Sequence, residues 1–295
     1  MQHTHGVVTP PERRDALRLS DGRRLAWSEW GPADGRPILF CPGAGMSGWL
    51  GFGAAEVAEL DLRLMAIDRA GLGASDPHPA KTLSSWADDV AELIGARGLE
   101  SPLAVGFSQG AVFALALAGR GLVTAAALVA GQDELGHPGI RPLLHPDVAA
   151  MLATVEADAA GFERHVAATA TAEWLWGLIA GMSSETDRAL YERPDFADAY
   201  RTALAEGFGQ GADGYARDLV NALGPWLVRP EEVHVPVDLW YGVLDTSTVH
   251  SPDFGATLAE RLPRSTRTVD PDAGGSLLWT RSRDILTRLR SHASG

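Results

Sequence analysis

Residues 106–110 read Gly-Phe-Ser-Gln-Gly, the pattern G-x-S-x-G, which sets Ser108 between two residues of minimal bulk. The apolar run before this serine, residues 103–107, predicts a buried strand, and the alanine-rich segment after it, to about Arg120, predicts a helix. A serine at such a turn is lifted out of the sheet at the positive end of a helix. We therefore expect Ser108 to face a carbonyl carbon while the Gln109 N–H points at the carbonyl oxygen.

An aspartate that could orient an imidazole follows a later strand. Residues 235–241 (VPVDLWY) predict a strand, and Asp245 ends the Gly-Val-Leu-Asp segment after it. A carboxylate in this place would hold a histidine in one tautomer and stabilise its cation. A capping or turn role for Asp245 is the structural alternative, and Asp133 is the alternative acid.

Composition bounds the class of protein. The chain has 295 residues, 45% of them hydrophobic, and a formal charge of −13, which disfavours partners such as nucleic acid and anionic membranes. No stretch approaches the ~18 apolar residues of a membrane span, and the start of the chain lacks the apolar region of a secretory signal. Cys41 is the only cysteine, so no internal disulfide can form. We expect a cytoplasmic enzyme acting on a small molecule, its oligomeric state left open.

The order of the predicted elements indicates the fold class. Strands are expected within residues 16–30 (a hairpin) and at 37–41, 62–67, 103–107, 122–130, 235–241 and 267–269, with helices among them. This alternation is typical of an α/β fold with a doubly wound, mostly parallel sheet. The predicted divisions are a flexible tail (1–14), a first core part (15–131), a helical cap (132–230) and a second core part (231–295).

The predicted cap is rich in aromatic residues. Trp174, Trp176 and Trp226 are candidates to line a largely apolar pocket over the serine, although packing between cap helices is an equally good reading of each. The expected ligand is an elongated or aromatic small molecule that contains a carbonyl group.

These segments together resemble the α/β-hydrolase family, specifically its capped, esterase- and aminopeptidase-like bacterial members, from residue 15 onward. Residues 42–45 (PGAG) resemble the family's H-G-x-x-G loop with Pro42 in place of histidine, which implies the Ala44 N–H as the second oxyanion donor. Residues 68–75 resemble the mainly structural D-x-x-G-x-G-x-S loop, and the resemblance makes Asp245 the triad acid.

The resemblance also implies a histidine after the last strand, where this chain has Gly275. Neither Gly274 nor Ser276 can replace an imidazole. His250, five residues after Asp245, is the nearest possible substitute base, but a polar residue at a helix start is the more economical reading of it. We therefore expect a degenerate triad, with activity impaired or repurposed.

Three hypotheses follow from this pattern. The first is an esterase-type serine hydrolase. If its catalytic histidine has been replaced by Gly275, the substitution Gly275→His should create esterase activity. The second is a lyase, isomerase or cyclase that uses the same pocket, and the third is a catalytically silent ligand-binding protein. No cofactor is expected, because no histidine–carboxylate set has zinc-ligand spacing and no glycine-rich segment has dinucleotide-binding spacing.

Overall fold

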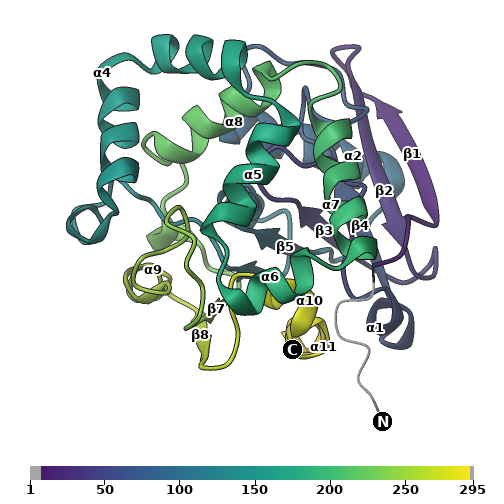
Figure 1. The fold of residues 1–295 in the computed structure, drawn as a ribbon. Coiled ribbons are helices and arrows are strands. Elements are labelled where there is room, and N and C mark those ends of the chain that lie inside the picture. The colour runs from purple at the N-terminus through teal and green to yellow at the C-terminus, as the bar shows by residue number, and fades with distance from the viewer. Residues whose placement is uncertain (1–7, 293–295) are drawn as a thin grey trace.

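One eight-stranded sheet organises the computed structural model, which describes residues 8–292. The strand order is β1-β2-β4-β3-β5-β6-β7-β8; β2 is antiparallel to β1 and β4, and all other neighbours are parallel. The strands are β1 (Arg13–Arg18), β2 (Arg24–Trp30), β3 (Arg36–Cys41), β4 (Leu62–Ile67), β5 (Leu103–Phe107), β6 (Ala126–Val129), β7 (Val237–Gly242) and β8 (Ser265–Asp270). The predicted fold class is confirmed (Figure 1).

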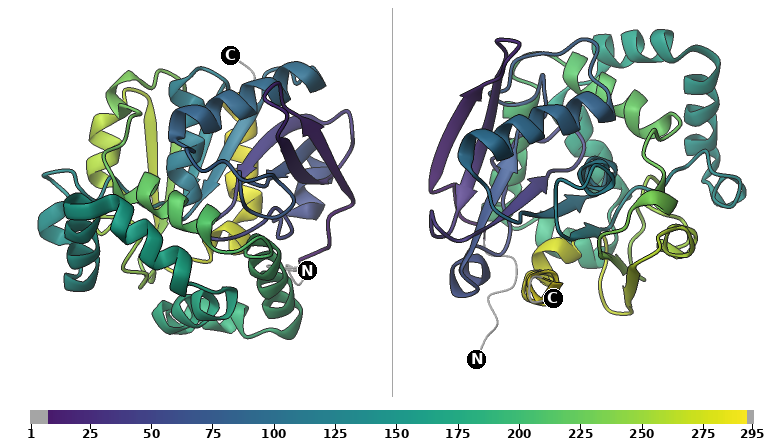
Figure 2. Two further views of the ribbon diagram at one scale, coloured as in Figure 1. Left: turned by 90° about the horizontal axis from the view of Figure 1, so that it is seen from above. Right: turned by 180° about the vertical axis from the view of Figure 1, so that it is seen from behind.

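Helices cover both faces of the sheet, which explains why its central strands are apolar without alternation. Every residue of β5 and β6 is buried. One face packs against α1 (Ala54–Glu59), α10 (Leu277–Thr280) and α11 (Ser282–Ser291). The other packs against α2 (Leu83–Arg97), α3 (Gly110–Gly119) and α9 (Ala256–Arg261) (Figure 2).

Five helices between β6 and β7 form a cap over the carboxyl ends of the parallel strands (Figure 1). They are α4 (Pro146–Thr169), α5 (Ala172–Met182), α6 (Glu185–Tyr191), α7 (Pro194–Gly207) and α8 (Asp213–Leu223), flanked by short 3-10 turns at Arg141–Leu143 and Pro230–Glu232. The long α4 bends at Asp158, whose backbone leaves the helical region. Among residues 8–292, no helix is long and apolar enough to cross a membrane.

Three predicted boundaries differ from the structure. The first strand begins at Arg13, inside the predicted tail of residues 1–14, because it pairs with β2 through Arg13–Glu29; residues 1–7 of that tail lie outside the described part. β6 is shorter than the predicted 122–130, since Leu122 still bonds back to the carbonyl of Leu117 at the end of α3. β8 is longer than predicted, because it pairs with β7 over six residues.

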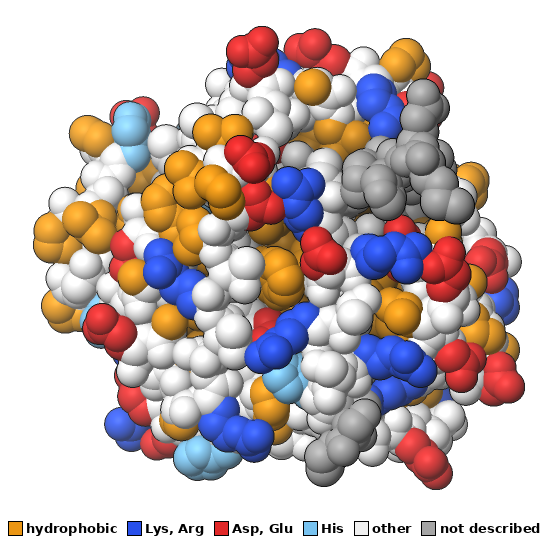
Figure 3. Space-filling model, turned by 90° about the horizontal axis from the view of Figure 1, so that it is seen from below, with side chains coloured by type: hydrophobic (Ala, Val, Ile, Leu, Met, Phe, Trp, Pro, Cys, Tyr) orange, Lys and Arg blue, Asp and Glu red, His pale blue; other side chains and the backbone are white. Residues whose placement is uncertain are grey.

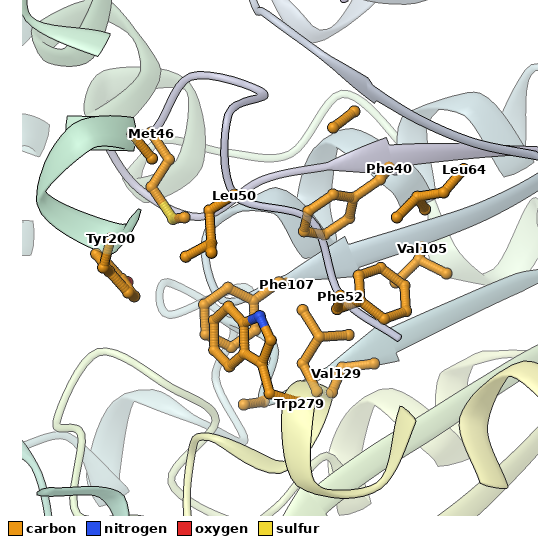
Figure 4. Close-up of a cluster of buried hydrophobic side chains, with 14 of the residues drawn as sticks. Phe40, Met46, Leu50, Phe52, Leu64, Val105, Phe107, Val129, Tyr200 and Trp279 are labelled. Carbon is orange, nitrogen blue, oxygen red and sulfur yellow. The ribbon is translucent and has the colours of Figure 1, made fainter. Parts of the chain in front are cut away.

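The core continues from the sheet into the cap. Phe107 at the end of β5 meets the ring of Trp279 edge-on, with centroids 4.8 Å apart. Tyr200 projects from cap helix α7 to the margin of the same cluster (Figure 4), 6.1 Å from the ring of Trp279. Aromatic packing therefore ties the cap to the strand that immediately precedes Ser108.

Candidate active site

Ser108 occupies a sharp turn between β5 and α3. Its φ of +52° is a left-handed conformation that a residue with a side chain adopts only under constraint. A Cβ on Gly106 would lie 2.6 Å from the Gly110 carbonyl oxygen, and one on Gly110 would collide with the Cys41 carbonyl. There is therefore no room for a side chain at either of these positions. Ser108 itself is only half-buried, whereas its neighbours in β5 are enclosed.

The imidazole of His250 lies directly beside this serine. His250 Nε2 is 2.9 Å from Ser108 Oγ, and His250 Nδ1 is 2.6 Å from Asp245 Oδ2. A carboxylate only accepts hydrogen bonds, so the proton belongs on Nδ1 and Nε2 is free to accept the serine proton. His250, the possible substitute base of the sequence analysis, therefore supplies an imidazole from the loop after β7, whereas position 275 holds glycine. The simpler interpretation of His250 as a polar residue at a helix start is wrong, because the next helix, α9, begins only at Ala256.

The segment after His250 is fastened to the sheet. Ser251 donates its N–H to the Gly131 carbonyl at 3.0 Å and its hydroxyl to Asp133 Oδ2 at 2.9 Å. Asp133 is enclosed, and burial raises the pKa of its carboxyl. The alternative acid of the sequence analysis therefore contacts Ser251, and Asp245 is the carboxylate that contacts the imidazole.

Two backbone N–H groups beside Ser108 face the cavity. The Gly43 carbonyl accepts a hydrogen bond from Arg69 at 2.9 Å, and the Ser108 carbonyl accepts from the N–H groups of Ala111 and Gln132. Because these peptides are trans, the following N–H groups of Ala44 and Gln109 point the opposite way. Within residues 8–292, neither N–H has a hydrogen-bond acceptor, and both residues line the cavity.

Arg69 is part of a buried ion cluster that joins the cap to the core. Its guanidinium donates to the carbonyls of Pro42 and Gly43 and pairs with Asp218 of α8 at 2.7 Å. Lys81 approaches the other oxygen of Asp218 at 2.6 Å, and all three charged side chains are enclosed. One cap carboxylate is therefore the shared counter-ion of two buried cations.

Gly275 lies against the acid rather than beside the serine. A Cβ there would sit 2.9 Å from Asp245 Oδ1. Its N–H and that of Ser276 both donate to Asp187 of α6, at 3.0 and 2.8 Å. The segment where the resemblance expects histidine is instead a contact between core and cap, and the absence of a side chain leaves room for the Asp245 carboxylate.

A cavity of about 540 Å³ contains Ser108, Asp245, His250 and Gly275. Much of its wall is apolar and comes from the cap, including Val148, Met151, Phe162, Leu175, Ile179 and Leu219. A wider depression of about 1100 Å³ is lined by residues such as Arg36 and Glu100 but by none of these four. The smaller cavity is therefore the candidate site.

The three predicted tryptophans have different places. Trp174 lies in the cavity wall and is half-exposed. Trp176 does not line the cavity; its ring packs 5.3 Å from that of Tyr200. Trp226 lies with the α2–α3 face of the core and donates to the Ala222 carbonyl, so its expected pocket role is also wrong.

The surface of the molecule seen from below shows exposed hydrophobic side chains that gather toward the upper left of the view, among charged groups of both signs (Figure 3).

Several cavity residues have no distinctive sequence signal. Asp187 and the tyrosines Tyr191, Tyr200 and Tyr215 line the cavity, yet they belong to ordinary helical segments without a motif. Only the three-dimensional path of the cap brings them over Ser108. Burial raises the pKa of Cys41 to about 12, which leaves its thiol inert. Residues 8–292 contain no cluster of three or more histidine, cysteine or acidic side chains that could hold a metal ion.

Comparison with known proteins agrees with this fold. The chain is 33% identical over 97 residues to a non-heme chloroperoxidase of Streptomyces lividans, a match that covers 32% of this chain and only 35% of that relative. An esterase from Rhodococcus sp. superposes with a TM-score of 0.64 at 19% identity, covering 97% of this chain and 98% of the other. The enol-lactonase of Burkholderia xenovorans gives 0.67 at 17% identity, covering 95% and 100%.

A sequence profile of the alpha/beta hydrolase family matches residues 38–286, a span that includes the elbow at Ser108, the whole cap and the loop carrying Asp245 and His250. The matched span is most of the chain, and the strand order and elbow geometry agree with it. The chain therefore belongs to the alpha/beta hydrolase family.

Proposed function

We propose that the protein is an esterase-type serine hydrolase with Ser108 as nucleophile, His250 as base and Asp245 as the acid that orients it. The observation that carries this proposal is the continuous pair of contacts from Asp245 Oδ2 through the imidazole to Ser108 Oγ, at 2.6 and 2.9 Å. A serine hydroxyl becomes a useful nucleophile near neutral pH when such a base accepts its proton.

In the proposed reaction, Ser108 Oγ attacks the ester carbonyl as its proton passes to His250 Nε2. The N–H groups of Ala44 and Gln109 stabilise the oxyanion, and Asp245 stabilises the imidazolium. His250 then protonates the leaving alcohol as the carbon–oxygen bond breaks. Water, deprotonated by the same imidazole, hydrolyses the acyl-enzyme, which releases the acid and restores the serine.

The names of two structural neighbours support this reaction class. Solved structures of the same fold include an esterase and an enol-lactonase. The apolar cavity above Ser108 suits an ester with an apolar acyl or alcohol group.

Labelling by a fluorophosphonate tests the proposal directly. We expect one equivalent of phosphonyl group on Ser108, located by peptide mass spectrometry, together with complete loss of p-nitrophenyl ester hydrolysis. Ser251→Ala is not a suitable control because Ser251 holds the base loop, so an exposed serine replacement, Ser291→Ala, serves instead. Absence of labelling while the chain is folded would refute the proposed nucleophile.

Introducing histidine at position 275 is expected to reduce the rate, not to create it. The Cβ alone would stand 2.9 Å from Asp245 Oδ1, so the carboxylate must move away from His250 Nδ1. Misplacement of a catalytic group by about 1 Å costs on the order of 10²-fold in kcat.

The matched control for this substitution is Gly95→His on α2, where an added Cβ meets nothing within 4 Å and activity should be retained. A rise in kcat for Gly275→His would show that the present imidazole is not the working base.

A further inference from the structure

Three tyrosine hydroxyls inside the cavity lack partners. Tyr191, Tyr200 and Tyr215 all line it, and each residue is at least nine-tenths buried. Within residues 8–292, none of their hydroxyls forms a hydrogen bond with the protein. The side-chain amide of Gln109 also lacks a partner but is sealed inside the protein, whereas the three phenolic oxygens are not among the sealed atoms and belong to residues that line the cavity.

Unpartnered polar groups in an apolar enclosure indicate what the ligand must supply. A buried hydroxyl that gains no hydrogen bond loses its hydration without compensation. Phenylalanine would fill the same space at no such cost. The three hydroxyls are therefore best explained by a ligand that brings hydrogen-bonding atoms to them.

The three phenols remain neutral and can donate as well as accept. Burial raises the pKa of Tyr200 and Tyr215 above the usual range. Burial also raises the pKa of Tyr191, which is raised further by Tyr200, Asp187 and Asp245. The Tyr191 and Tyr200 rings lie 5.7 Å apart, so two of the hydroxyl-bearing groups are neighbours on the side of the cavity near Asp245.

The charges around the cavity exclude one kind of ligand. Asp147, Asp187 and Asp245 line it, and among the described lining residues the basic side chains are three histidines, with no lysine or arginine. Arg69 is close by but is fully committed to Asp218 and to two backbone carbonyls. A carboxylate or phosphate on the substrate would lose its hydration here beside three acidic side chains and with no lysine or arginine to pair with it.

We propose that Tyr191, Tyr200 and Tyr215 form a recognition subsite for an uncharged ester or lactone whose largely apolar body carries a hydroxyl or carbonyl oxygen. The inference rests on the proposed function, because it assigns the substrate class of the same cavity and takes the ester group of that substrate from the proposed reaction. It adds two requirements that hydrolysis alone does not impose: a polar oxygen away from the scissile bond, and no negative charge.

Binding to the Ser108→Ala variant tests the subsite without turnover. Methyl 4-hydroxyphenylacetate and its 3-hydroxy isomer are compared with the corresponding methyl-substituted esters, which have nearly the same shape, and with the 4-carboxylate. Calorimetry should show at least one hydroxy ester binding about 2- to 12-fold more tightly than its methyl counterpart, the range for one neutral hydrogen bond. The carboxylate should bind more weakly than either.

Tyr→Phe replacements locate the effect. The preference for the hydroxy ester should disappear with at least one of the replacements Tyr191→Phe, Tyr200→Phe and Tyr215→Phe. Binding of the methyl ester should stay the same or tighten. Tyr241→Phe is the matched control, because Tyr241 is buried outside the cavity; it should leave the ratio of the two affinities unchanged.

Four outcomes would overturn the subsite. The first two are equal or weaker binding of both hydroxy esters relative to their methyl counterparts, and a preference for the hydroxy ester that survives all three cavity replacements. The others are tightest binding of the carboxylate, and no binding of any probe. Turnover is measured separately with the intact chain and p-nitrophenyl esters. Selective binding without any turnover would leave the subsite standing and reject the proposed hydrolase; turnover without selectivity would do the reverse.

Discussion

Replacing His250 by alanine is expected to lower kcat for ester hydrolysis by about 10⁴- to 10⁶-fold, with little change in KM. The imidazole is the sole group in hydrogen-bond contact with Ser108 Oγ among the described residues, and its other nitrogen is held by Asp245. Without it, the serine proton has no acceptor and the leaving alcohol has no proton donor. The remaining rate would come from the cavity and the two N–H groups.

Steady-state kinetics and the rate of fluorophosphonate labelling measure this loss, and both should fall together because both need the activated hydroxyl. His234→Ala provides the matched control, since His234 is exposed, lies outside the cavity and should tolerate replacement. If the His250 variant kept more than about a hundredth of the activity, another base would have to be sought, contrary to the usual effect of deleting a triad member.

The position of this base follows from how its loop is anchored. Asp245 and His250 lie five residues apart on one loop after β7, and Ser251 ties the far side of that loop to Asp133 and Gly131. Acid and base are thus positioned by the same short segment. The loop after β8 therefore does not have to supply the base, and its N–H groups at Gly275 and Ser276 donate to Asp187 of the cap.

The elbow was predictable because its causes are local. Gly106 and Gly110 are required by contacts with the turn itself and with the neighbouring strand, and the sequence shows an apolar strand and an alanine-rich helix on either side. Burial on both faces likewise accounts for the apolar central strands, so the fold class could be inferred from composition along the chain.

The sequence indicates His250 only as a possible substitute base, because its contact with Ser108 has no local cause of this kind. His250 and Ser108 are 142 residues apart, and a hydrogen bond between them depends on loop anchors at Ser251 that no motif displays. The predicted pocket roles of Trp176 and Trp226 were wrong for a related reason. Residue type predicts that Trp176 and Trp226 are buried, but not whether their rings face a cavity or a neighbouring helix.

Asp218→Asn is expected to lower the free energy of unfolding by about 3–5 kcal/mol, the usual consequence of removing one partner from a buried ion pair. Asp218 is the shared counter-ion of Arg69 and Lys81, and all three side chains are enclosed. A loss of this size is a large part of the ~5–15 kcal/mol that stabilises an ordinary domain. Arg69 also holds the Gly43 carbonyl, so kcat should fall as the Ala44 N–H loses its fixed direction.

Urea unfolding near pH 7 measures the change in stability. Asp213→Asn is the matched control: it is the same replacement on the same helix, α8, but at an exposed position, where the effect should stay within about 0.5 kcal/mol. A loss below about 1 kcal/mol for Asp218→Asn would mean that the two cations do not need the carboxylate, contrary to the usual cost of an uncompensated buried charge.

The pH dependence of this defect separates the two cations. Burial lowers the pKa of Lys81 below its usual 10.5, and Asp218 opposes that shift. The unfolded chain therefore binds the lysine proton more tightly than the folded chain, so this group makes stability rise with pH between its folded pKa and 10.5. Without Asp218 the folded pKa falls further, and the penalty for charging Lys81 grows at neutral pH. The stability difference between Asp218→Asn and the parent chain should consequently narrow from pH ~7 to ~9.5, whereas the share due to Arg69, which keeps its charge, should persist. A difference that is constant over this range would assign the whole defect to Arg69 and the loop that forms the oxyanion site.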